Sequence, residues 1–344
     1  MRVVEIQPIA NIEVMHIEGE RVHMSGWVVH RAHPLSHVTL VVNSRPWAND
    51  VPLFDRPDVG RHLYPKLPHT IRSGFKVTLP VDRSQWVEGA NKLELIVKSG
   101  AKEQGVATIA VRDLAKDAER FPVPSQILKL HVGLKRDDFL ATGWRVYSDL
   151  KREVGRFGGW ATFDRVLDWG CGCGRVLRYL LEDVPAERVF GCDIDREAIE
   201  WLARNARESS FEAIQPAPPT PYPEGHFDLI YGVSIFTHLS EEMQDEWLDE
   251  LARISRPGAL VAVTLHGWDL APRRLRRSLQ KRGFAEMGSA QAAYFAPYAG
   301  GRYYRTAFHT PAYVESHWSR HFDLLEYRSR AINAHQDLVV MRKR

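Results

Sequence analysis

The second half of this 344-residue chain alternates short apolar runs with helix-like segments, and this alternation constrains the fold more than any other feature. A strand, a crossover helix and a second strand pack as a βαβ unit, and repeated units build a parallel sheet. The predicted strands are 165–169, 188–193, 227–233, 259–265, 322–328 and 337–342, and the predicted helices are 175–181, 196–208, 241–254 and 311–318. The sequence therefore predicts an α/β fold with a doubly wound sheet.

The first 113 residues follow a different pattern, in which short alternating runs are separated by Gly, Pro and Asn turns. Alternation of apolar and polar residues is typical of half-buried strands, and no helical period interrupts it. The predicted strands are 12–17, 22–30, 37–43, 74–80, 92–98 and 106–111. We expect residues 1–113 to form an all-β, Ig-like sandwich that acts as an accessory domain.

A charged, helix-prone segment begins at Asp113 and is closed by Phe121-Pro-Val-Pro124. Proline restricts the residue before it to extended conformations, so this segment is a natural boundary. Two helices are expected after it, at about 125–132 and 137–157. We expect residues 114–160 to be a helical linker that caps the binding site of the α/β domain, which would occupy residues 161–344.

Three glycines lie between the first strand and the first helix of the α/β region, in Asp168-Trp-Gly-Cys-Gly-Cys-Gly174. A strand-to-helix turn presents backbone N–H groups and the positive end of the helix dipole, and glycine lets a ligand approach closely. The turn therefore predicts a nucleotide-like ligand. The nicotinamide fingerprint G-x-G-x-x-G would need glycine where this chain has Arg175, which argues against a dinucleotide.

Asp193 ends the second predicted strand about 20 residues beyond the glycines, where a carboxylate can accept hydrogen bonds from both ribose hydroxyls. Asp195 is followed by Arg-Glu and is better explained as a helix N-cap. Cys171, Cys173 and Cys192 lack the spacing of a four-ligand metal site, so we expect no metal and reduced, buried thiols.

These motifs, together with Phe227-Asp-Leu-Ile-Tyr231, Ser234-Ile-Phe-Thr-His-Leu239 and Arg256-Pro-Gly-Ala-Leu260, resemble class I S-adenosylmethionine-dependent methyltransferases over about residues 125–344. The resemblance implies a Rossmann-like seven-stranded sheet with helices on both faces, whose last strand runs antiparallel. It also implies S-adenosyl-L-methionine as cofactor. The cofactor-binding residues that it implies are Asp168, Gly170, Cys171, Gly172, Gly174, Asp193, Ile194 and Ser234. Where the family often has an acid for the adenine amino group, this chain has Gln215 between Ile214 and Pro216.

Methyl transfer to a hydroxyl needs a base beside the acceptor, and ligands of parallel sheets bind at the carboxyl ends of the strands. His238, His266 and His309 are the candidates, since each follows a strand or precedes a helix at this edge. We rank His266 and His309 above His238. The alternative for each is a hydrogen-bonded structural histidine.

The long insertion 267–308 is positioned to cover the acceptor. Its first half contains a basic helix-like stretch at 272–282, which is either a solvated helix face or a contact for a phosphate-bearing acceptor, a membrane surface or nucleic acid. Its second half, 294–308, is rich in aromatic residues around Gly300-Gly301 and could form a lid or simply pack.

The sequence predicts an enzyme that methylates a sugar or glycolipid hydroxyl, an assignment that rests on resemblance to bacterial polysaccharide-associated methyltransferases. Protein or small-metabolite methylation, a non-catalytic cofactor-binding protein and a nicotinamide-dependent oxidoreductase are the alternatives. A net charge of +3 gives no global attraction to nucleic acid, so none is expected as partner. The chain has neither a signal-like start nor an apolar run of membrane length, so we expect a cytoplasmic location. Peripheral membrane contact through 273–282 and a homodimer stay open.

Overall fold

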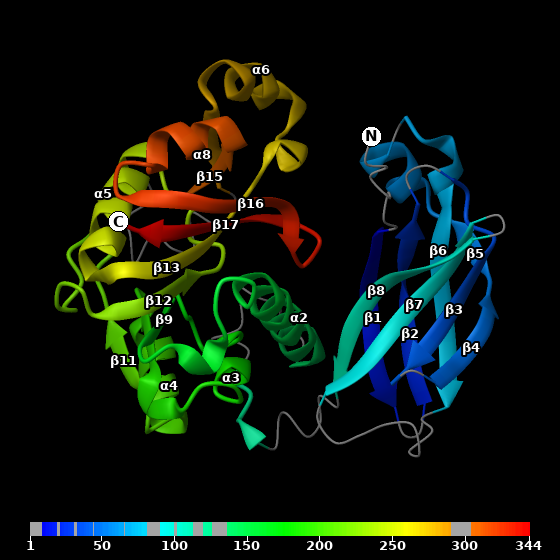
Figure 1. Ribbon diagram of the computed structural model, residues 1–344, viewed down its shortest axis with the longest axis horizontal. Helices are drawn as coiled ribbons and strands as arrows, with labels where there is room; N and C mark the ends of the chain where they lie inside the picture. The colour runs from blue at the N-terminus through cyan, green and yellow to red at the C-terminus, as the bar shows by residue number, and fades with distance from the viewer. Residues whose placement is uncertain are drawn as a thin grey trace. The chain divides into compact units, whose positions relative to one another are not determined.

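The computed structural model describes residues 9–18, 21–30, 33–43, 45–64, 66–80, 90–99, 102–112, 120–125, 136–289 and 304–344. The chain divides into two compact units, Met1–Arg120 and Phe121–Arg344 (Figure 1). Residues 113–119, residues 126–132 of the helix expected at 125–132, and residues 294–303 of the aromatic segment 294–308 lie outside the described residues.

The N-terminal unit is β-rich and contains two antiparallel sheets, in the orders β1-β2-β6-β5 and β4-β3-β7-β8. Its strands are β1 (Ile9–Glu18), β2 (Arg21–Val29), β3 (His37–Val42), β4 (Arg45–Val51), β5 (Leu53–Asp55), β6 (Arg72–Pro80), β7 (Ala90–Ser99) and β8 (Lys102–Arg112). Buried residues of both sheets, among them Met24, Leu40, Phe75 and Leu95, belong to one core cluster. The six predicted strands are present, whereas β4 and β5 were not predicted from the sequence.

The C-terminal unit is built on a seven-stranded sheet in the order β11-β10-β9-β12-β13-β17-β16. Its strands are β9 (Val166–Trp169), β10 (Val189–Asp193), β11 (Ser210–Ala213), β12 (Phe227–Gly232), β13 (Ser255–Leu265), β16 (Phe322–Ile332) and β17 (Gln336–Lys343). β17 runs antiparallel to both β13 and β16, and the other neighbouring strands of this sheet are parallel. The expected α/β sheet with an antiparallel last strand is confirmed.

Helices cover both faces of this sheet, because each face buries its own apolar cluster. The helices are α2 (Arg136–Val154), α3 (Leu177–Leu180), α4 (Arg196–Asn205), α5 (Glu241–Ile254), α6 (Arg273–Arg282) and α8 (Pro311–Trp318). Tyr147 of α2 and Leu202 of α4 belong to one cluster, whereas Trp247 of α5 and Trp318 of α8 belong to the other. None of the described helices is long and apolar enough to cross a membrane.

Side-chain caps begin α4, α5 and α8, which start at the residues predicted from the sequence. Asp195 accepts a hydrogen bond from Ala198 N at 3.1 Å, and Ser240 and Thr310 cap α5 and α8 in the same way. Such caps satisfy backbone N–H groups that the first helical turn leaves free. The carboxyl ends of β10 and β12 are thereby followed at once by ordered turns, which hold the residues of the candidate site.

The insertion after β13 contains the short helix η6 (Trp268–Leu270), α6 and a two-stranded ribbon of β14 (Phe284–Gly288) and β15 (Arg305–His309). The ribbon was not predicted from the sequence. It is tied to the main sheet edge by Arg305 N, which donates to His238 O at 2.8 Å, and by His309 N, which donates to His266 O at 2.9 Å. The second half of the expected lid is therefore in part a strand.

Candidate functional site

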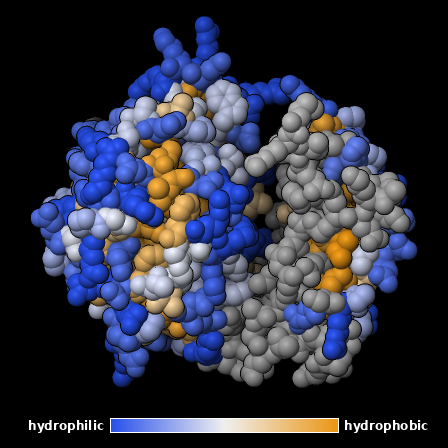
Figure 2. Space-filling view, in the orientation of Figure 1, coloured by the Kyte–Doolittle hydropathy of each residue, from blue (hydrophilic) through white to orange (hydrophobic). Residues whose placement is uncertain are grey.

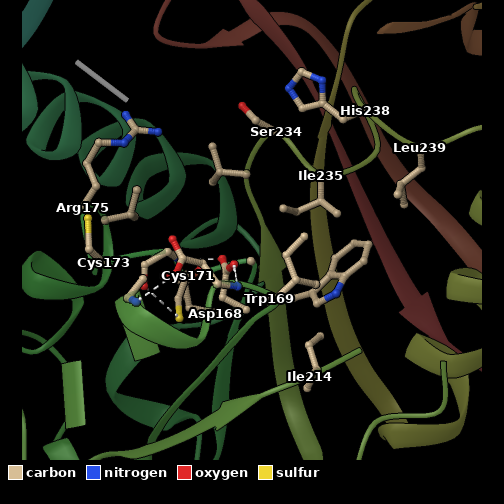
Figure 3. Close-up of a pocket in the computed structure, with 18 of the residues that line it drawn as sticks. Asp168, Trp169, Cys171, Cys173, Arg175, Ile214, Ser234, Ile235, His238 and Leu239 are labelled. Carbon is tan, nitrogen blue, oxygen red and sulfur yellow. Dashed lines mark hydrogen bonds between the residues drawn. The ribbon is translucent and has the colours of Figure 1, made fainter. Parts of the chain in front are cut away.

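A cavity of about 510 Å³ opens at the carboxyl ends of β9, β10 and β12. Parallel sheets bind ligands at this edge, where the strand order reverses between β9 and β12. Seven of the eight predicted cofactor-binding residues line it: Asp168, Gly170, Cys171, Gly172, Asp193, Ile194 and Ser234. Figure 3 shows Ser234 and His238 on one side of the cavity, with Ile214 on the other.

The backbone conformation of this turn requires glycine. Gly170 and Gly172 have φ of +78° and +50°, in the left-handed region that residues with a Cβ avoid. A Cβ on Gly170 would lie 2.1 Å from Ile235 Cδ1. Gly174, the eighth predicted residue, does not line the cavity; a Cβ there would lie 2.6 Å from Leu202 Cδ2, so this glycine serves helix packing.

Asp193 lines the cavity and is held by two backbone groups. Its carboxylate accepts hydrogen bonds from Gly172 N at 2.7 Å and from Asp195 N at 2.9 Å. Burial raises the pKa of this carboxyl, and the two backbone donors oppose that rise. Each carboxylate oxygen can accept more than one hydrogen bond, so the residue can still receive two hydroxyl groups.

One end of the cavity is apolar. Ile194 follows β10, and Ile214, Pro216 and Trp247 complete the wall. Gln215 is exposed and does not line the cavity, so this chain offers no side-chain acceptor there from its third motif. A flat aromatic group would pack against these apolar side chains.

The other end carries two charged side chains. Asp168 is 3% exposed, and its Oδ2 has no hydrogen-bond partner in the described structure. Burial is the main cause that raises its pKa to about 7. The Arg175 guanidinium also lines the cavity and makes neither a hydrogen bond nor an ion pair with a described residue; burial lowers its pKa. From the sequence, Arg175 stood out only as a departure from a glycine pattern.

His238 is the candidate base that lines the cavity. Its Nδ1 lies 3.2 Å from the Arg305 carbonyl oxygen, which can only accept, so Nδ1 carries the proton and Nε2 keeps its lone pair. The ring stacks on Tyr304 at 4.3 Å between centroids. Burial lowers the pKa of His238 to about 4, so the imidazole is neutral at neutral pH.

The ranking of His266 and His309 above His238 is not supported by the positions of these rings. His309 is fully buried and absent from the cavity wall; its Nε2 lies 2.8 Å from Gln244 Oε1. Because Gln244 Nε2 donates to the carbonyls of Phe236 and Leu239, its Oε1 must accept, and His309 is the donor. His309 thus braces the loop that carries His238.

His266 stands behind the cavity rather than in its wall. Its ring centroid lies 6.3 Å from that of His238 and 5.9 Å from that of His335. Burial, with His238 and His335 nearby, lowers its pKa to about 4. Because His266 does not line the main cavity, it would not touch a ligand bound there.

A second cavity of about 80 Å³ adjoins the first, with Arg175, Ser234 and Asn333 in both walls. His335 and Gln336 extend it, and Gln336 Nε2 donates to Ser234 Oγ at 2.6 Å. Ser234 has φ of +64°, a strained conformation for a residue with a Cβ that is common at binding sites. The hairpin between β16 and β17 therefore belongs to the site, although none of its residues was predicted as a site residue from the sequence.

The three cysteines are buried and free, and burial raises the pKa of each thiol. A buried neutral thiol is a poor nucleophile and a poor metal ligand. Within the described part of the chain no group of three His, Cys, Asp or Glu could hold a metal ion. Cys171 shapes the cavity wall beside Gly191 instead.

Residues 166–258 match the family model of a methyltransferase domain. The human tRNA N(3)-cytidine methyltransferase METTL2B is 24% identical over 159 residues, which are 43% of this chain and 42% of that protein. Ajmaline N-methyltransferase of Rauvolfia serpentina is 25% identical over 169 residues, 46% of this chain and 56% of that protein. The chain spans about half the length of these two relatives.

Solved structures of methyltransferases are also similar. One is the Burkholderia thailandensis 1,6-didemethyltoxoflavin-N1-methyltransferase, with 1,6-didemethyltoxoflavin and S-adenosylhomocysteine bound. It is 16% identical, with a TM-score of 0.43 over 73% of this chain and 95% of that chain. The family match lies within the unit Phe121–Arg344, which contains the whole cavity.

Proposed function

We propose that this chain, which carries a methyltransferase domain at residues 166–258, uses S-adenosyl-L-methionine to methylate a hydroxyl group of a sugar or glycolipid. The observation that carries the cofactor is that a carboxyl with one unpartnered oxygen, Asp168, and a buried guanidinium, Arg175, both line one end of the cavity. Asp168 and Arg175 both face it without neutralising each other through an ion pair. A buried charge without a partner is costly, and an amino-acid zwitterion supplies a partner for each.

The order of residues along the cavity supports the same cofactor. Asp168 and Arg175 would hold the ammonium and carboxylate of the methionine part, Asp193 the ribose hydroxyls, and the wall of Ile194 and Ile214 the adenine. When bound, the cofactor supplies an electrophilic methyl group on a sulfonium. The turn at Gly170 and Gly172 brings the backbone close enough to hold the methionine part.

His238 is the proposed general base. Its Nε2 lone pair can take the proton of an acceptor hydroxyl while the oxygen attacks. The bond from Nδ1 to the Arg305 carbonyl fixes the ring, and Tyr304 covers one face of it. Positioning of the acceptor in the cavity contributes the rest of the rate.

The acceptor class rests on resemblance and on the base. A hydroxyl holds its proton tightly and needs a base, whereas amines and thiols can accept a methyl group on proximity alone. Protein and small-metabolite acceptors are the alternatives within this activity. The oxidoreductase alternative lacks support, because Arg175 stands where the nicotinamide fingerprint needs glycine.

The N-terminal unit has a separate role in this proposal. Its two sheets share one core cluster, which supports a sandwich, and none of its residues lines the described cavity. We assign it no part in cofactor binding.

Methyl transfer from labelled S-adenosylmethionine to a panel of oligosaccharides, glycolipids, proteins and small amines tests the function. The proposal predicts label in a sugar hydroxyl, lost in His238→Ala. Label in amines only would contradict the acceptor class, and cofactor binding without transfer to any acceptor would favour a non-catalytic protein.

A further inference from the structure

The second cavity, of about 80 Å³, has no role in the function proposed above. It shares Arg175, Val233, Ser234 and Asn333 with the main cavity, so a molecule bound in the main cavity can extend into it. An apolar cavity of about 150 Å³ accepts benzene. At about half that volume, the second cavity holds a substituent and not a sugar ring. Its occupant is therefore one group of a larger molecule that lies in the main cavity.

Neutral hydrogen-bonding side chains dominate the wall of the second cavity. They are Ser234, Asn333, His335 and Gln336. Burial is the main cause that lowers the pKa of His335, so this ring is neutral at neutral pH. Among the described residues that line the second cavity, Arg175 is the one with a charge, and none is an Asp or Glu. The wall therefore selects by hydrogen bonds more than by charge.

One acceptor in this wall lacks a donor. Gln336 Nε2 donates to Ser234 Oγ at 2.6 Å, and Gln336 Oε1 is buried with no hydrogen-bond partner in the described part of the chain. Ser234 Oγ receives that bond and keeps its own O–H to donate. Many hydrophilic side chains stand on the face of the C-terminal unit that Figure 2 shows, where water supplies their hydrogen bonds. The buried amide oxygen has no such supply, so a ligand group that donates to it after a small rotation about χ3 gains free energy.

The backbone that carries these groups is strained and braced. Ser234, Asn333 and Ala334 have φ of +64°, +52° and +50°, in the left-handed region that residues with a Cβ avoid. Asn333 N donates to Asp149 Oδ2 at 2.8 Å, and Arg145 Nη1 donates to Asn333 Oδ1 at 3.0 Å, so α2 holds the tip of the hairpin. Strain that surrounding contacts maintain is typical of ligand-binding sites. The second cavity is thus shaped in advance of its occupant.

The pattern of donors and acceptors decides which group fits. A carboxylate or phosphate only accepts hydrogen bonds, so it would leave Gln336 Oε1 without a donor. An ammonium only donates, so it would leave the Ser234 O–H without an acceptor, and the Arg175 charge would repel it. A hydroxyl both donates and accepts, so it can satisfy Gln336 and Ser234 together.

We propose that the second cavity binds a further, unmethylated hydroxyl of the acceptor, which Gln336 and Ser234 recognise. Ser234 lines both cavities and lies on the same side of the main cavity as the proposed base His238 (Figure 3). One acceptor molecule can therefore place one hydroxyl at His238 and another at Gln336. The inference rests on the proposed methyl transfer and narrows its acceptor from any hydroxyl compound to a diol or polyol.

Methyl transfer by the full-length chain to methyl glycosides of glucose, galactose, mannose and rhamnose, each with its monodeoxy analogues, tests the inference. For the glycoside that takes the label, kcat/KM should fall by about 10–10²-fold in the analogue that lacks the recognised hydroxyl. Gln336→Met, which keeps the size of the side chain and removes its amide, should lose about the same factor on the parent glycoside and almost nothing on that analogue. Ser234→Ala, the second variant, should reduce the same preference.

The matched control, Gln215→Met, makes the same substitution at an exposed residue outside both cavities and should keep the wild-type preference. Gln336→Met should bind S-adenosylhomocysteine within about threefold of wild type, which shows that the cofactor cavity is intact. Equal losses on parent and analogue in both variants would overturn the inference and leave methylation of a sugar standing. Label in none of the glycosides would also overturn it, and label in amines instead would contradict the proposed function as well.

Discussion

His238 and Arg305 are joined by two hydrogen bonds: the ring Nδ1 donates to the Arg305 carbonyl at 3.2 Å, and Arg305 N donates to the His238 carbonyl at 2.8 Å. The pair connects the loop after β12 to β15. Its consequence is chemical, because a carbonyl that accepts from Nδ1 leaves Nε2 as the basic nitrogen. A base proposed for the cavity is thus oriented by a strand that the sequence did not predict.

The first prediction concerns His238. His238→Ala should lower turnover by about 10²–10⁴-fold and leave the affinity for S-adenosylhomocysteine within about threefold, because the imidazole meets the acceptor. His266→Ala, which alters a ring outside the cavity, is the matched control and should change turnover by less than about tenfold. Burial lowers the pKa of His238 to about 4, so the acid limb of the turnover profile should lie near pH 4 rather than 6.5. An acid limb that persists in His238→Ala would contradict this assignment.

The second prediction concerns Arg175 and separates the two ends of the cofactor. Arg175→Gln should weaken S-adenosylhomocysteine by about 10–10²-fold, the effect of losing a charge-assisted hydrogen bond. Methylthioadenosine, which lacks the amino-acid part, should bind wild type and variant alike. Calorimetry with both ligands measures the difference. A similar loss for both ligands would mean that Arg175 supports the fold of the cavity and not the carboxylate.

The third prediction concerns the pH dependence of cofactor binding. Asp168 has a pKa of about 7 in the free protein, raised by burial, and only its carboxylate attracts an ammonium group. Affinity for S-adenosylhomocysteine should therefore rise as the pH rises through about 7, by up to about tenfold per unit below the pKa. Asp168→Asn, which keeps the shape, should flatten this profile. A slope that survives in the variant would assign it to another group.

The fourth prediction concerns stability. Burial lowers the pKa of His309 to about 3, so between pH 6.5 and 3 the unfolded chain binds a proton that the folded chain does not. Stability falls as the pH falls through this window, by about 2 kcal/mol per histidine between pH 6.5 and 5.

His309→Gln removes one such group while keeping a donor for Gln244. Its free energy of unfolding should therefore drop less than that of wild type between pH 7 and 5 in denaturant titrations. The raised pKa of Asp168 changes the stability with pH in the opposite direction, and it does so equally in wild type and His309→Gln. Equal drops would remove His309 from the account.

Much of the fold follows from sequence pattern, because the long strands and capped helices carry their own signals. β13 has a buried apolar run, and α8 has Thr310 and Pro311 at its start. β11 has four residues, none of them fully buried, and β5 has three, so neither gives a recognisable period. β15 could not be predicted because its pairing with β14 depends on residues far apart in the chain.

The site shows the same limit. The glycine turn and Asp193 are local to adjacent strands, so their spacing alone brings them to one cavity. The three histidines share an edge of the sheet. His309 differs from the other two because it donates to Gln244, which itself donates to the carbonyls of Phe236 and Leu239, and these contacts form only in the folded chain. Arg175 was missed because a charge without a partner is visible only once burial is known.

The central claim is that the cavity at the Gly170 turn binds S-adenosylmethionine, and titration calorimetry of S-adenosylhomocysteine tests it most directly. The account predicts micromolar-class binding, weakened by about 1–3 kcal/mol in Asp193→Ala, which leaves ribose hydroxyls unpartnered. It predicts no measurable binding of NAD under the same calorimetric conditions. Failure of the wild-type chain to bind S-adenosylhomocysteine, or tighter binding of NAD, would contradict the account.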